Sequence, residues 1–240
     1  MGVISPVGND VNTFWSNLCN GVCGIDHIKS FPTDNLPVGI AGIIKDFKPE
    51  EYGMDKPFIR KQDLFTQYGV AAAYQAMKQS GLSSQGENKN IDPFRLGVYF
   101  GSGIGGFATQ YREISKMIED PSGQWISPLF IPTMISNIAA GHIAILNNAQ
   151  GPCLDIVTAC ATSTNAMGEA FRAIRNGYAD AIITGGCENA TIPIGIVGFA
   201  NAKALSRATD PNYASLPFNG NRAGFVMADG SAALVLEEYE

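Results

Sequence analysis

The stretch DIVTACATSTNAM, residues 155–167, decides the fold because it joins a predicted strand to a predicted helix at one cysteine. The mostly apolar residues 154–157 predict a buried strand, and apolar side chains at helical spacing after residue 160 predict a helix. Cys160 then lies in the first turn of that helix. Unpaired backbone N–H groups and the positive end of the helix dipole point at this turn. They favour the thiolate and offer a donor to an oxyanion, so the pattern indicates a nucleophile.

The same pattern also fits a cysteine that only packs. Small residues such as Ala159 and Ala161 around a thiol at a strand-helix junction are typical of tight packing. Free cysteines are, in addition, among the most buried residues in proteins. Local geometry alone leaves both interpretations open.

Predicted strands and helices alternate along the chain, which favours a layered α/β domain over an all-α or all-β one. We expect helices over residues 10–20, 63–80, 111–118, 134–146, 162–176 and 195–203, and strands over residues 37–44, 96–100, 153–157, 181–184 and 232–238. One domain of 240 residues is the expected organisation.

Composition excludes several classes of protein. With 45% hydrophobic and 16% charged residues, the chain can bury a large core, and its net charge of −6 argues against a nucleic-acid partner. No apolar run reaches membrane-spanning length and no signal segment follows Met1, so we expect no membrane contact and a cytoplasmic location. Five cysteines without a paired CxxC spacing, and only two histidines, argue against a disulfide framework and a metal site.

Residues 158–186, TACATSTNAMGEAFRAIRNGYADAIITGG, closely resemble the nucleophile loop, buried helix and following strand of β-ketoacyl-acyl-carrier-protein synthases. Other segments resemble that family in the same order: GVISPVGNDVNTFW (2–15), QYGVAAAYQAMKQSGL (67–82), GVYFGSGIGG (97–106), PTMISNIAAGHIAI (132–145), GFANAKALS (198–206) and NRAGFVMADGSAALVLEEYE (221–240). The likeness is closest to the elongating type II ketosynthases of fatty-acid synthesis. A GxGxxG-like turn at residues 101–106 is only a weak sign of dinucleotide binding, because no acidic residue follows at the expected spacing.

The resemblance implies a fold and a reaction. The fold is the amino-terminal half of a thiolase-like layered α-β-α domain, with a mixed five-stranded sheet whose first strand is truncated before Met1. Loss of that strand would leave its neighbours unpaired. The reaction is transfer of an acyl group to Cys160 from the phosphopantetheine of an acyl carrier protein, followed by decarboxylative condensation with a malonyl thioester. No other cofactor is implied.

The resemblance also assigns an acyl pocket and a dimer. Ile104 and Phe199 match residues along the acyl channel, and Phe130 matches one contributed across the interface of a homodimer. Central strands near residues 152–157 would pair across that two-fold axis. Without the resemblance, all three apolar residues fit an ordinary core equally well.

Two basic clusters match the regions where the family docks its acidic carrier protein. The first contains Lys56, Arg60 and Lys61, and the second contains Lys203 and Arg207. By composition alone, such clusters are more typical of a solvated surface. Screened charge attraction would suit a carrier that leaves after each cycle.

The groups that complete the family's reaction are not among the matched residues. The chain has His27 and His142, and neither matches the family's catalytic histidines, which lie in its second half. Ala223 and Ala228 stand where the family often has an acidic residue and a glycine. Two alternatives therefore stay open: a catalytically incomplete subunit that only dimerises or complements another chain, and a polyketide-type condensing enzyme.

Overall fold

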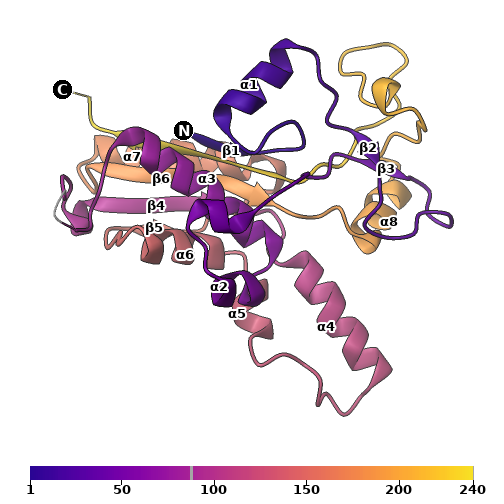
Figure 1. Ribbon diagram of the computed structural model, residues 1–240, viewed down its shortest axis with the longest axis horizontal. Coiled ribbons are helices and arrows are strands. Elements are labelled where there is room, and N and C mark those ends of the chain that lie inside the picture. Colours follow the sequence, from indigo (N-terminus) through magenta and orange to yellow (C-terminus); the bar gives the residue numbers. More distant parts are fainter. Residues whose placement is uncertain (87–88, 240) are drawn as a thin grey trace.

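The computed structural model describes residues 1–86 and 89–239, and within them five strands form one mixed sheet in the order β1-β7-β6-β4-β5 (Figure 1). The strands are β1 (Gly2–Ile4), β4 (Leu96–Gly101), β5 (Cys153–Leu154), β6 (Ala181–Glu188) and β7 (Gly230–Glu237). β4 runs parallel to β5 and β6, whereas β7 is antiparallel to β1 and β6. The expected mixed five-stranded sheet is confirmed.

Helices cover both faces of this sheet, as a layered α-β-α domain requires. α3 (Leu64–Ser80) and α6 (Ile138–Leu146) share a core cluster with Val98 and Phe100 of β4. α7 (Thr162–Arg175) packs instead on Tyr99 of the same strand and on Ile182 of β6. This alternation follows from the period of two along a strand.

The remaining elements border the layers. They are α1 (Val11–Cys19), α2 (Lys56–Lys61), α4 (Phe107–Glu119), α5 (Phe130–Met134), α8 (Pro193–Asn201), a small sheet of β2 (Asp26–His27) and β3 (Ile40–Ala41), and four 3₁₀ turns, η1 (Pro49–Tyr52), η2 (Pro93–Arg95), η3 (Ala159–Ala161) and η4 (Pro211–Tyr213). No helix in the described part of the chain is long and apolar enough to span a bilayer.

Three sequence-based predictions of secondary structure are wrong in part. The strand expected over residues 37–44 shrinks to β3, which pairs with β2 outside the main sheet. The fifth strand of the main sheet is β1, in a segment where no strand was expected; it pairs with β7. The helix expected over residues 134–146 is divided, because Ile135 is extended and the carbonyl oxygen of Met134 accepts a hydrogen bond from the N–H of Gly106.

The prediction of a buried strand at residues 154–157 is also wrong. Only β5 forms there, at the edge of the sheet, and Leu154 and Val157 are each about half exposed, at 49% and 50%. An apolar run indicates that its side chains are buried in the functional protein. It cannot show whether the same chain or a partner buries them.

α4 projects away from the sheet (Figure 1) and is held by a buried carboxylate. Glu113, 1% exposed, accepts hydrogen bonds from Lys116 Nζ at 2.9 Å, Arg112 Nε at 3.0 Å and the N–H of Ser127 at 3.0 Å. Burial alone would raise the pKa of Glu113, but these three donors outweigh it and lower the pKa to about 2. The charged carboxylate thereby ties α4 to the segment that leads into α5.

We expect Glu113→Gln to lower the free energy of unfolding by on the order of 2 kcal/mol at pH 7, a figure discounted because Arg112 and Lys116 are partly exposed. Because the pKa of Glu113 is lower in the folded state, its contribution is present above the unfolded pKa and is lost as the pH falls from about 5 towards 2. Urea unfolding of both proteins from pH 7 to pH 3 measures this difference. The exposed Glu119→Gln on the same helix is the control, and a difference that stays constant with pH would contradict the assignment.

Candidate active site

Cys160 lies in the 3₁₀ turn η3, directly before α7, and its side chain is exposed. The structure therefore places it just ahead of the first α-helical turn, where the sequence predicted it inside that turn. The N–H of Thr158 donates to Thr162 Oγ1 at 3.0 Å, and Asn165 Nδ2 donates to Thr158 Oγ1 at 2.8 Å. These bonds fix the turn, while Ala159 adopts a left-handed φ of 51° that is uncommon for alanine.

The cysteine turn rests directly on the end of β4. A Cβ at Gly101 would collide with the carbonyl oxygen of Ile156 and lie 2.5 Å from Thr162 Cγ2. Only glycine allows β4 and the segment that leads to Cys160 to approach so closely.

A cavity of about 730 Å³ opens beside Cys160, and its lining is mostly apolar. Ile104 and Phe199, both predicted from the resemblance, line it together with Cys160. Phe199 packs edge to face on Phe225, with ring centroids 5.5 Å apart. Other apolar lining residues come from β1, β7 and the segment before β7: Val3, Ile4, Val226, Met227 and Ala232. An extended apolar ligand fits such a surface.

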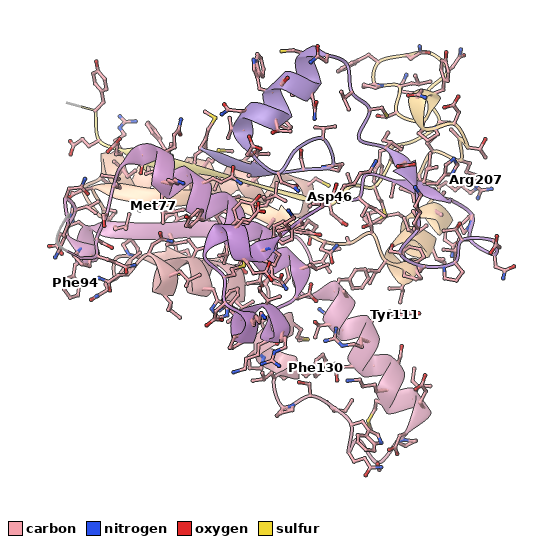
Figure 2. All side chains as sticks on the ribbon, viewed as in Figure 1. Asp46, Met77, Phe94, Tyr111, Phe130 and Arg207 are labelled. Atoms are coloured by element: carbon pink, nitrogen blue, oxygen red, sulfur yellow. The ribbon has the colours of Figure 1, made fainter. Side chains whose placement is uncertain are left out.

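The third predicted pocket residue, Phe130, does not line this cavity. It is half-buried on α5, and Figure 2 shows it near the base of α4, at the lower part of the molecule. One copy of the chain therefore does not bring Phe130 and Cys160 together.

A buried carboxylate positions α8, the helix that carries Phe199. Asp229 accepts hydrogen bonds from Asn189 Nδ2 at 2.9 Å and from the N–H groups of Ala190 and Thr191 at 3.0 and 3.1 Å. Burial raises the pKa of Asp229, and these donors counter part of that rise. The network fixes the path from β6 into α8.

Ala228, a departure from the family pattern, is accommodated locally. Its backbone pairs with Gly42, and a Cβ at Gly42 would lie 2.7 Å from the methyl of Ala228. Because residue 42 is a glycine, the facing backbone leaves space for the methyl group of Ala228. Ala223 is exposed and has no such contact to explain it.

The sequence reasoning missed two carboxylates, of which the first holds the turn between β4 and α4. Glu188, at the end of β6, lines the cavity and binds Ser102 and Gly103; burial raises its pKa. Asp155 accepts a hydrogen bond from Ser136 Oγ at 2.6 Å, and burial raises its pKa as well. An acidic residue at the end of an apolar strand, as in TGGCE, was the available signal.

The first basic cluster lies on α2, where Lys56, Arg60 and Lys61 are all exposed. Arg60 and Lys61 also line a separate cavity of about 450 Å³, together with Arg112 and Lys116 of α4, which the sequence reasoning did not connect with them.

The second basic cluster is exposed too, but it lies elsewhere. Lys203 follows α8 in a left-handed conformation, with φ 58°, and Arg207 lies in the loop beyond it. Figure 1 shows α2 in the lower centre of the view and α8, which Lys203 follows, well apart from it at the right, so the two clusters do not form a single patch in one chain.

Neither histidine lines the cysteine cavity. His142 packs edge to face on Phe58 with ring centroids 4.9 Å apart, and burial lowers its pKa. His27 lies in β2 and is exposed. Across residues 1–86 and 89–239, no three histidine, cysteine or acidic side chains gather as a metal site would need.

The cavity geometry predicts an order of thiol reactivity. We expect limiting iodoacetamide at pH 7 to modify Cys160 stoichiometrically and Cys187 last, because Cys187 is buried and burial raises its pKa. Cys153 should also lag, since burial and the charge of Asp155 raise its pKa. Peptide mapping by mass spectrometry measures the order, with Cys160→Ser as control. Preferential labelling of Cys19 or Cys187 would contradict the prediction.

Comparisons with known proteins agree with this geometry. Residues 1–240 match the family model of the β-ketoacyl synthase N-terminal domain. The chain is 44% identical over 241 residues to 3-oxoacyl-[acyl-carrier-protein] synthase 2 of Vibrio cholerae serotype O1, and 43% identical over 240 residues to the protein of that name from Staphylococcus aureus. These matches cover 100% of this chain but 57% and 58% of the relatives, so the chain spans less than two thirds of their length.

Two solved structures share the fold. A β-ketoacyl synthase from Burkholderia phymatum superposes with a TM-score of 0.84 at 24% identity, covering 99% of this chain and 58% of that one. A type II polyketide ketosynthase, solved in complex with its acyl-carrier protein and bound to a hexaketide, gives 0.85 at 27% identity, covering 99% and 56%. The chain therefore belongs to the β-ketoacyl synthase family, whose N-terminal domain it matches from residue 1 to residue 240.

Proposed function

We propose that this chain is the nucleophile-bearing part of a 3-oxoacyl-acyl-carrier-protein synthase of fatty-acid biosynthesis, acting in the cytoplasm. The observation that supports this most directly is Cys160 at an apolar cavity lined by Ile104 and Phe199. The identity of 44% to synthases of that name favours the same reaction.

The first step is an acyl transfer. Cys160 Sγ, as the thiolate, attacks the carbonyl carbon of an acyl thioester carried on the phosphopantetheine of an acyl carrier protein. The carbon-sulfur bond to Cys160 forms, the bond to the carrier sulfur breaks, and the released carrier thiolate takes a proton. The backbone N–H of Cys160 is the proposed donor to the oxyanion that forms in between.

The second step is a condensation. A malonyl thioester loses carbon dioxide, and the resulting carbanion attacks the acyl thioester on Cys160, which forms the new carbon-carbon bond and frees the thiolate. The negative charge on the malonyl carbonyl needs positioned donors. Neither histidine lines the cavity, so we assign these donors to no residue of this chain.

The cavity would bind the acyl chain, with each buried methylene stabilising the complex by about 0.8 kcal/mol. We further propose a homodimer in which a second copy supplies Phe130 to the far end of the channel. The exposed apolar edge at Leu154 and Val157 supports this, because an uncovered strand edge is normally paired or blunted.

Two other functions remain candidates. A polyketide-type condensation is supported by the likeness to a polyketide ketosynthase, but its 27% identity is well below the 44% to fatty-acid synthases. A subunit that only dimerises or complements another chain is supported by the absence of a histidine from the cavity lining. The retained cysteine at the cavity favours a catalytic role over this second candidate.

Acyl transfer to the isolated chain tests the proposal. We expect incubation with octanoyl-acyl-carrier protein to add one octanoyl group, found at Cys160 by intact mass and peptide mapping, and Cys160→Ala to abolish it. Condensation should require addition of a polypeptide that corresponds to the part of the relatives that this chain does not match. Octanoylation elsewhere, or none in a folded chain that dimerises, would support the non-catalytic candidate instead.

Carrier docking has its own test. Reversing the charges with Arg60→Glu and Lys61→Glu should raise the KM for the acyl-carrier protein about tenfold at low salt, with less effect at about 0.5 M salt, because screening removes the attraction. Lys78→Glu reverses one positive charge elsewhere, at an exposed lysine in the last turn of α3, and should have little effect. Equal effects of the variants would contradict docking on α2.

A further inference from the structure

A single carboxylate from β6 holds the turn that carries Ile104. Glu188 Oε1 accepts a hydrogen bond from Ser102 Oγ at 2.9 Å, and Oε2 accepts one from the N–H of Gly103 at 2.8 Å. Ser102 Oγ in turn accepts from the N–H of Gly105 at 2.9 Å. Ile104 is thereby flanked in sequence by residues that are bound directly or through Ser102 to this carboxylate.

The same turn touches the cysteine turn. A Cβ at Gly103 would lie 2.7 Å from Glu188 Oε2 and 3.7 Å from the carbonyl oxygen of Ala159. Gly103 is therefore close both to the carboxylate and to the residue before Cys160. Ser102 is 1% exposed, so its hydroxyl has little access to water as a substitute partner.

Burying the carboxylate of Glu188 costs free energy unless hydrogen bonds compensate for the lost water. Removing a charge from water is unfavourable, and burial does raise the pKa of Glu188. The hydrogen bonds to the turn offset that cost, because a charged acceptor binds N–H and O–H donors more strongly than a neutral one. Glu188 also faces the cavity that Cys160 and Ile104 line, so its bonds fix a wall of that cavity.

From this arrangement we infer that Glu188 is a positioning residue, which holds Ile104 as a wall of the acyl cavity and thereby sets the length of chain that can reach Cys160. The inference rests on the proposed function in that the cavity receives an acyl chain. Its test uses alkylation, which needs neither a carrier protein nor condensation.

N-alkyl iodoacetamides from ethyl to hexadecyl provide the measurement. We expect the rate of alkylation at Cys160 to fall beyond a certain chain length in the native chain. In Glu188→Leu, which keeps the bulk but removes the acceptor, the ratio of the hexadecyl to the ethyl rate should rise about tenfold, as expected for the loss of charged hydrogen bonds. Glu188→Gln should retain the native profile, because its amide can still accept from Gly103 and donate to Ser102.

A second variant changes Gly103, the partner of Glu188 in this contact. It tests the inference even if Glu188→Leu does not fold. In Gly103→Ala the new methyl must displace the carboxylate, so the length profile should shift in the same direction, and the two changes should be non-additive when combined. Gly168→Ala on α7, where a Cβ meets no atom within 4 Å, is the matched control.

The outcomes are distinct. A rise in the long-to-short ratio with Glu188→Leu or Gly103→Ala, and none with Gly168→Ala, supports the inference. Equal changes in the ethyl and hexadecyl rates, or an unchanged profile in folded variants, would overturn it. Failure of octanoyl transfer from the carrier protein, with a shifted alkylation profile, would instead count against the proposed function alone.

Discussion

The close approach of two backbones at Gly101 is the constraint on which the rest depends. The end of β4 meets the segment leading to Cys160 with no space for a side chain between them. Because Gly101 is also paired with Gly186 on β6, both strands end beside the cysteine, and the turns that follow them enclose one cavity. The helices on either face stabilise the sheet, but the contact at Gly101 fixes the position of Cys160 and of the cavity beside it.

Elements with a long, clear period were predictable, and short ones were not. α3, α7, β4 and β6 extend over several repeats of their patterns, so the apolar spacing identifies them. β1 has only three residues, too few to show an alternation, and it becomes a strand because β7 offers it unpaired backbone groups. Likewise, the sequence shows that the residues around β5 are apolar, but it does not show what packs on them.

The same difference holds for the candidate site. Cys160, Ile104 and Phe199 belong to recognisable motifs, and the fold does bring them to one cavity. Glu188 and Ser102 are 86 residues apart, and the bond between them exists only because β4 and β6 are neighbours. Arg112 joins Arg60 and Lys61 for a similar reason, since α4 and α2 line one cavity. Predicting contacts between distant segments requires the order of the strands in the sheet, and the periodicity of the sequence does not give that order.

The exposed edge at β5 has a consequence for regulation. Only residues 155–159 separate Leu154 from Cys160, so a strand that joins this edge also restrains the backbone leading to the thiol. Thermodynamic linkage then works in both directions: whatever favours one arrangement of the thiol favours edge pairing by the same free energy. The amount of paired chain would thus change with the concentration of any ligand that binds one arrangement of the thiol more tightly than the other.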